Sequence, residues 1–236
     1  MVSSATIPLS TAPVRAGVLL RRLMLALALP VLLQTAWAAS VEVRVLDRTG
    51  KPVPDVVVTL NDQRRATAAE ARNLSMTMDQ VNMRFVPELL VAPVGAKVAF
   101  RNSDTVSHQV YSFSPAKPFQ LSLYRGSGNP PVLFDKPGLV VLGCNIHDEM
   151  VAYIFVTAAP LYGKTDARGR IAWNNANDGP AMVAIWSPLL ADADAGSRQI
   201  TVSGSSQETP QVVEFRLSKA LRGSPYPRAR RAEWSY

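Results

Sequence analysis

Three side chains that bind soft metal ions lie close together in the stretch GCNIHDEM, residues 143–150. Cys144 is the only cysteine in a chain of 236 residues, and His147 is one of two histidines. A single thiol cannot form an internal disulfide, so in an oxidising compartment it must be buried, paired between chains or held by a metal. The spacing of cysteine, histidine and Met150 favours the metal.

The second histidine, His108, is the remaining imidazole that could complete this site. Zinc sites are built from cysteine, histidine and carboxylates. Two histidines and a cysteine with a weak axial methionine form a blue copper centre instead. We therefore predict one mononuclear type 1 copper ion, with the ligands His108, Cys144, His147 and Met150. The alternatives are zinc, or no metal, with the cysteine and methionine as buried core residues and the histidines as polar loop residues.

Two predicted strands flank the metal-binding stretch. Residues 138–143 would end in the cysteine, and residues 151–156 would lead the chain away from the methionine. The loop between them must turn within a few residues, and a rigid sheet would hold its side chains still. A preformed site that accepts both Cu(I) and Cu(II) limits reorganisation, which favours electron transfer.

Short apolar or alternating segments, separated by glycine and proline, fill most of the remaining chain. This pattern predicts an all-β protein, a sandwich or barrel. The predicted strands are residues 41–45, 55–60, 82–86, 89–92, 97–101, 108–113, 182–186 and 212–217, with a hairpin at 162–171. Residues 66–74 are the single segment with a helical composition.

The amino end has the features of a secretory signal peptide. Arg15, Arg21 and Arg22 precede the short apolar run LMLALALPVLL, and Ala36-Trp37-Ala38 is a small-x-small cleavage pattern. The run is too short to span a bilayer comfortably, although a membrane anchor is the alternative. We expect a periplasmic protein that begins near Ala39 and has no stable membrane span once the signal is removed.

The high net charge of the chain comes from its two ends. The three arginines of the signal reduce the formal charge from +7 to +4 when they are removed, since 7 − 3 = 4. Residues 218–236 contain five basic residues and one acidic residue, which is also +4. The part that folds is thus close to neutral, so the charge gives no reason to expect nucleic-acid binding.

Residues 81–156 resemble a plastocyanin-like cupredoxin. The motifs are Phe85-Val86-Pro87, Gly95-x-Lys97-Val98-x-Phe100-x-Asn102-x-Asp104 and His108-x-Val110, and Cys-x2-His-x2-Met has the short spacing of amicyanin. The strings Tyr111-Ser112-Phe113-Ser114 and Gly143-Cys144-Asn145-Ile146-His147-Asp148 are similar to an exported group often labelled methylamine-utilisation proteins. Thr165-Asp166-x-x-Gly169 resembles strands of a carboxypeptidase regulatory domain, which accompany the cupredoxin in that group.

The resemblance implies a Greek-key β-sandwich and copper ligation by the four residues named above. It also implies a hydrogen bond from the backbone N–H of Gln109 to the thiolate. We accordingly divide the chain into a signal peptide (1–38), accessory amino-terminal strands (39–75), a cupredoxin domain (76–158), accessory β-sandwich strands (159–217) and a basic, flexible tail (218–236).

The expected function is transfer of single electrons between periplasmic redox partners, such as a c-type cytochrome or a dehydrogenase. Asp148 and Glu149 flank the second histidine and would favour a basic partner, unless both simply point into water. We do not expect an enzyme, because a second copper site would need further histidines, haem c would need a CxxCH motif, and a serine hydrolase would need a nucleophile elbow. The alternative is a copper carrier or sensor without a redox role.

Overall fold

The protein is all-β in the part that the computed structural model describes, residues 39–62, 74–191, 194–203 and 210–221. These residues form sixteen strands and no helix, which confirms the predicted fold class. All the strands belong to one compact unit, Trp37–Tyr236. The predicted signal peptide, the predicted helix except for Leu74, and most of the predicted tail lie outside the described residues. The described chain has no helix with the length and hydropathy to cross a bilayer.

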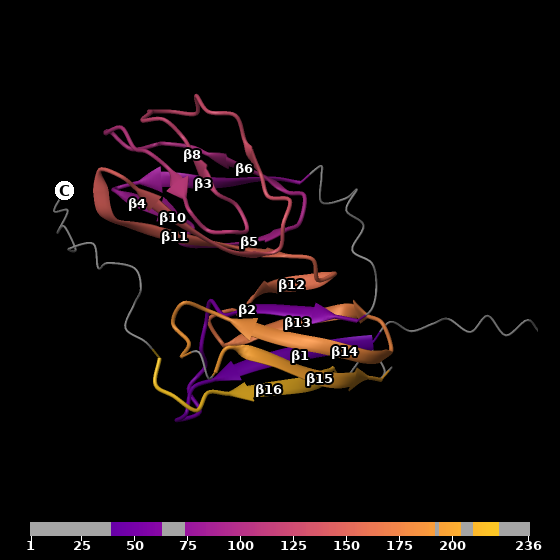
Figure 1. The fold of residues 1–236 in the computed structure, drawn as a ribbon. Helices are drawn as coiled ribbons and strands as arrows, with labels where there is room; N and C mark the ends of the chain where they lie inside the picture. Colours follow the sequence, from indigo (N-terminus) through magenta and orange to yellow (C-terminus); the bar gives the residue numbers. More distant parts are fainter. Residues whose placement is uncertain (1–38, 63–73, 192–193, 204–209, 222–236) are drawn as a thin grey trace, which may run out of the picture. The chain divides into compact units, whose positions relative to one another are not determined.

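Strands β3 to β11 form a sandwich (Figure 1). The candidate metal ligands belong to this part of the chain. Its strands are β3 (Ser75–Val81), β4 (Arg84–Val86), β5 (Leu89–Pro93), β6 (Lys97–Phe100), β7 (Tyr111–Ser112), β8 (Phe119–Gln120), β9 (Val132–Leu133), β10 (Gly138–Cys144) and β11 (His147–Thr157). One sheet has the order β5-β11-β10-β7-β8, and the other has the order β4-β3-β6-β9. The alternation along β10 explains the core, because Val140, Leu142 and Cys144 are buried while Val141 is exposed.

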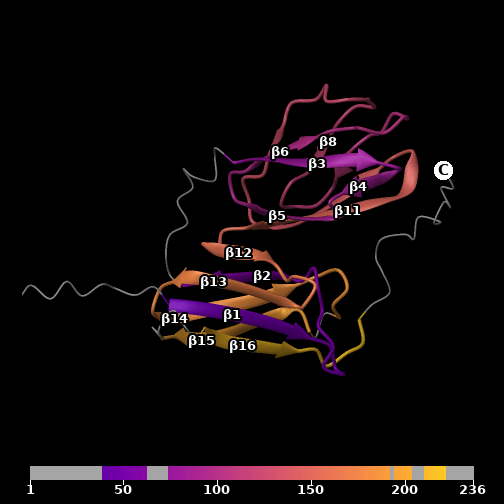
Figure 2. The same ribbon diagram turned by 180° about the vertical axis from the view of Figure 1, so that it is seen from behind.

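The remaining strands form a second sandwich, which Figure 2 shows from behind. They are β1 (Ala39–Leu46), β2 (Val57–Asn61), β12 (Leu161–Lys164), β13 (Arg170–Ala176), β14 (Gly179–Trp186), β15 (Gly196–Val202) and β16 (Gln211–Arg216). The sheet orders are β13-β1-β16 and β12-β2-β14-β15, so strands from both ends of the chain share one core. In β1, Val41, Val43 and Val45 face that core, as their alternation with Glu42 and Arg44 predicts.

The hairpin predicted at residues 162–171 is wrong. The turn itself forms, because the N–H of Gly169 donates to the carbonyl of Asp166 at 2.8 Å. The two strands then separate, since β12 pairs with β2 and β13 pairs with β1, in different sheets. The buried Thr165 is the cause: its hydroxyl bonds the N–H of Val56 and the carbonyl of Val53, which draws the chain into the sheet of β2.

Two other predicted strand boundaries differ from the structure. Asn82 and Met83, placed in a strand, instead form a turn with φ of 51° and 56° between β3 and β4. His108 lies outside the regular strands and pairs with Tyr124 in an isolated bridge, so only Tyr111–Ser112 of the predicted strand 108–113 is regular. This irregular backbone frees the segment to direct the imidazole of His108 inward.

Candidate metal centre

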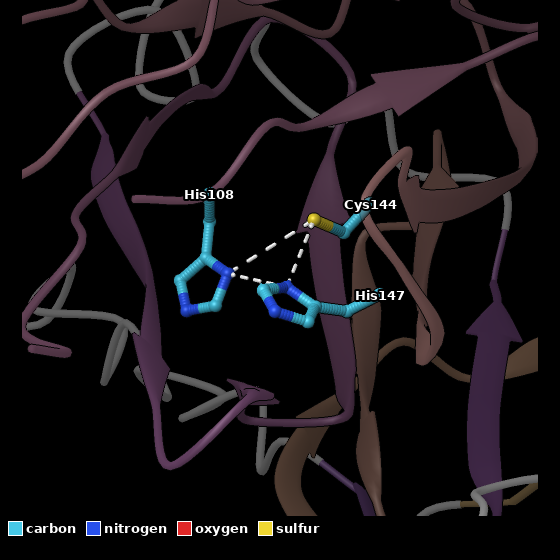
Figure 3. Close-up of side chains that lie close together, drawn as sticks. All are labelled: His108, Cys144 and His147. Carbon is cyan, nitrogen blue, oxygen red and sulfur yellow. Dashed lines mark hydrogen bonds between the residues drawn. The ribbon is translucent and has the colours of Figure 1, made fainter. Parts of the chain in front are cut away.

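His108, Cys144 and His147 converge at one end of the first sandwich (Figure 3). Their ligand atoms all lie within 4.8 Å of one another. The two Nδ1 atoms of the histidines are 3.1 Å apart. The sulfur of Cys144 lies 3.7 Å from Nδ1 of His147 and 4.0 Å from Nδ1 of His108. Residues separated by 36 positions in the sequence therefore meet at a single point, as their side-chain types predicted.

The junction of β10 and β11 explains how Cys144 and His147 come together. Cys144 ends β10 and His147 begins β11, and the two residues pair across the turn after a register shift at Gly143. A shift of this kind changes the direction of a side chain relative to the sheet. Cys144 is buried and belongs to the apolar core, whereas His147 is half-buried. The strands on either side of the turn hold both side chains in place.

The distances between the donor atoms fit a metal ion. An ion bonded at about 2.0–2.1 Å to nitrogen and about 2.3 Å to sulfur, at angles between tetrahedral and trigonal, separates its ligand atoms by about 3.3–3.8 Å. The three separations in the structure, 3.1, 3.7 and 4.0 Å, bracket that range. Small rotations of the side chains would therefore seat an ion between two imidazole nitrogens and a thiolate.

Asp104 fixes the orientation of the buried imidazole of His108. Its Oδ2 lies 3.0 Å from Nε2 of His108, on the ring edge opposite the cluster. A carboxylate accepts a hydrogen bond from the nitrogen it faces, so it favours the tautomer with the proton on Nε2 and the lone pair on Nδ1. The nitrogen that faces Cys144 and His147 is therefore the one prepared to bind a metal.

Asp104 is itself held by hydrogen bonds. Its Oδ2 accepts a 2.7 Å hydrogen bond from the N–H of Met83, in the turn between β3 and β4. Burial opposes ionisation of Asp104, but the hydrogen bonds from Met83 and His108 outweigh it and hold the pKa of the carboxyl below its ordinary value. The side chain is therefore ionised at neutral pH and available to His108 as an acceptor.

Hydrogen bonds of Tyr124 and Asn102 hold the chain segment that carries His108. The backbone of Tyr124 exchanges two 3.0 Å hydrogen bonds with that of His108. Its hydroxyl donates to the carbonyl of Phe100 at 2.9 Å and accepts from Nε2 of Gln80 at 2.6 Å. The buried Asn102 donates to the carbonyls of Val106 and Tyr124. These contacts fix both ends of the segment that carries His108.

The ligand role of Met150 and the hydrogen bond from Gln109 to the thiolate stay predictions. Met150 is buried in β11 and belongs to the same apolar cluster as Cys144. Asp148 and Glu149 are exposed on β11 next to His147. Asp104 was visible in the sequence four residues before His108, but its role depends on the turn at Met83, which the sequence pattern did not predict.

Solved structures of known proteins are similar to part of this chain. No protein-family model and no curated protein matches. A copper-containing nitrite reductase from Thermus scotoductus is 28% identical over 36% of this chain and 22% of its own, with a TM-score of 0.34. This chain therefore spans about a fifth of the length of that enzyme.

Two smaller proteins are also similar. A purple cupredoxin from Nitrosopumilus maritimus is 21% identical over 36% of this chain and all of its own, with a TM-score of 0.31. The reduced form of an amicyanin mutant is 18% identical over 42% of this chain and 98% of its own, with a TM-score of 0.33. Cupredoxins are thus among the proteins to which this chain is similar, as the sequence resemblance predicted.

Proposed function

We propose that this protein is a type 1 copper protein that carries single electrons between redox partners. The observation that carries the proposal is the convergence of two imidazole Nδ1 atoms and one thiol within 4.8 Å. His108, Cys144 and His147 would hold the ion, with Met150 as the weak axial ligand. A copper ion bound there would supply a reversible one-electron couple between Cu(I) and Cu(II).

The two histidines would have different tasks. His108 is fully buried and bonded to Asp104, so it anchors the site. His147 is half-buried, and its ring is the ligand closest to solvent. Asp148 and Glu149 are exposed beside it and would attract a basic partner, such as a cationic c-type cytochrome or a dehydrogenase. Charge reversal of both acids should slow transfer with such a partner and weaken its salt dependence.

Cys144→Ser is the direct test of the proposed centre. A thiolate–copper bond gives an intense visible absorption band and a narrow copper hyperfine splitting in EPR, and a serine hydroxyl gives neither. We therefore expect the Cu(II)-loaded protein to be coloured and reversibly reducible, and the variant to lose both properties. Met182→Ser, on the second sandwich, is the control. A wild-type protein that binds Cu(II) without the band would contradict the proposal.

A copper carrier or sensor is the second candidate, because the buried thiol suits Cu(I) storage as well as redox cycling. A carrier loses its metal readily to a chelator and exchanges electrons slowly between copies. An electron carrier retains its metal and exchanges rapidly. Removal of copper by a Cu(I) chelator and self-exchange measured by NMR therefore separate the two functions.

We also propose export to the periplasm, with removal of residues 1–38. The basic start, apolar run and Ala36-Trp37-Ala38 pattern support it. Cleavage after Ala38 would leave β1 intact, since that strand begins at Ala39. Amino-terminal sequencing of the protein recovered from a periplasmic fraction should therefore begin at Ala39.

A further inference from the structure

The residue before the cysteine ligand is in contact with an aromatic ring. Gly143 pairs with Tyr111 of β7, and a Cβ built on this glycine would lie 2.7 Å from Cζ and from Oη of the tyrosine. Real side chains do not approach so closely, so the ring of Tyr111 occupies the space that any other residue at 143 would fill. The backbone that joins Gly143 to Cys144 therefore leads directly from the thiol to this ring.

The aromatic contact continues to the surface. The rings of Tyr111 and Phe113 have centroids 5.1 Å apart, within the range of a favourable aromatic pair. Phe113 is 81% exposed, the largest exposed fraction among the large apolar side chains that the structure describes. Val141, two residues before Gly143 on the same face of β10, is also exposed. A buried cysteine and an exposed phenylalanine are thus joined by a short series of contacts.

Phe113 and Val141 lie in two stretches of sequence that are poor in charged residues. Residues 105–116 and 137–146 contain no aspartate, glutamate, lysine or arginine. The nearest lysine along the chain, Lys117, is paired with Asp135 at 3.3 Å. The exposed edge near His147 is different, because Asp148 and Glu149 flank it. The two surfaces differ in electrostatic character and would select different partners.

The outer face of this sheet is apolar well beyond Phe113. Leu89 and Val91 of β5, together with Tyr153 and Phe155 of β11, also face outward, and they pack in a cluster with Trp186. Tyr111 of β7 and Val141 of β10 continue the same face, and Phe113 directly follows β7. Tyr111 is half-buried, whereas Val141 and Phe113 are exposed. An exposed apolar region of this kind is typical of a docking surface.

We propose that Tyr111, Phe113 and Val141 form a second electron-transfer surface, which docks a redox protein whose cofactor edge is framed by uncharged, apolar side chains. This inference rests on the proposed function. One electron leaves the partner's cofactor, which is oxidised, and reduces Cu(II) to Cu(I); no proton moves and no bond is made or broken. The route runs through the ring of Phe113, the ring of Tyr111 and the backbone of Gly143 and Cys144. A charged partner would use the edge of His147 instead, so donor and acceptor could bind together.

Docking can be tested on the metal-free protein with ferrocenemethanol, a neutral and apolar iron complex. Titration into ¹⁵N-labelled protein should shift the amide signals of Tyr111, Phe113 and Val141. Phe113→Ser should weaken this binding about tenfold, whereas Phe113→Trp, which keeps an aromatic ring, should preserve it. Val212→Ser removes an exposed apolar side chain from β16 and is the control. Shifts confined to other residues would overturn the docking surface.

Electron transfer is then measured on the Cu(II)-loaded protein by stopped flow, with two reductants. Ferrocenemethanol should reduce Phe113→Ser about tenfold more slowly than the wild type, at a rate that does not depend on salt. Hexaammineruthenium(II), a cation, should reduce both proteins equally, at a rate that falls with salt and in Asp148→Asn. Equal effects of Phe113→Ser on both reductants, or no effect on either, would overturn the inference. Failure of both reductants with the wild type would overturn the proposed function itself.

Discussion

At the scale of single residues, Asp104 is the side chain that orients His108 for its role as a ligand in the proposed centre. Its Oδ2 receives hydrogen bonds from the N–H of Met83 and from Nε2 of His108. The first fixes the carboxylate and the second fixes the imidazole. An unsupported histidine would lose more rotational freedom on binding a metal, and so would bind it more weakly.

Asp104→Asn should therefore lower the affinity for copper. The amide can still accept one hydrogen bond, but it has no negative charge to hold the proton of His108 on Nε2. We expect the affinity for Cu(II), measured by competition with a chelator, to fall about 10–100-fold. Asp135→Asn, at an exposed carboxylate on the same sandwich, should leave it unchanged. Equal affinities of both variants and the wild type would show that Asp104 does not support the site.

At the scale of elements, the ring of Tyr111 occupies the space that a Cβ at Gly143 of β10 would need. The ring of Tyr111 also packs on that of Phe113, with centroids 5.1 Å apart, so moving it aside would break this contact. Gly143→Ala should lower the free energy of unfolding by about 1–3 kcal/mol, as overpacking does. Urea denaturation with the metal-free protein measures this without an effect of copper binding.

Gly196→Ala is the matched control for this substitution. Gly196 also lies in a strand, β15, but a Cβ there would meet nothing within 4 Å. This alanine should leave stability unchanged or raise it by about 0.4–1 kcal/mol, because it restricts the unfolded chain. If both alanines had the same effect, the collision with Tyr111 would not be the cause.

The elements also show what a sequence can predict. The alternation of Val41 and Val43 with Glu42 and Arg44 is local, so it predicted a strand and its buried face correctly. The partners of a strand are not local. The turn at Asp166–Gly169 suggested a hairpin, yet the hydrogen bonds of Thr165 to residues more than 100 positions earlier send β12 to another sheet.

The candidate site was predictable for a different reason. A chain with one cysteine and two histidines offers few combinations, so residue types alone brought together His108, Cys144 and His147. The supporting contacts were not predictable in this way. Asp104 and Tyr124 act through a turn with positive φ and an isolated bridge, and neither feature has a simple periodicity.

At the scale of the whole molecule, the proposed metal centre is part of the core of the first sandwich. Cys144 and Met150 belong to the same apolar cluster as Phe85, Phe134 and Ile154. Loss of core packing would therefore distort the ligands, and distortion at the ligands would be felt in the core. The segment of His108 is tied to this core by Tyr124, whose hydroxyl contacts Phe100 and Gln80.

Tyr124 should consequently make the stability of the whole fold sensitive to alkaline pH. Burial raises the pKa of its hydroxyl to about 12, against 10.0 in an unfolded chain, and the hydrogen bond from Gln80 reduces the effect only in part. The folded state thus holds the proton more tightly than the unfolded state, so this contribution to stability is complete below pH 10 and is lost as the pH rises towards 12.

Urea denaturation of the metal-free protein at pH 8 to 12 should show the decline. Tyr124→Phe lacks both hydrogen bonds of the hydroxyl, so its stability should be lower at pH 8. Because phenylalanine cannot ionise, the stability of this variant should fall less between pH 10 and 12. A parallel decline in both proteins would assign the alkaline sensitivity to other groups, such as Tyr153 and Tyr162, whose pKa values burial also raises.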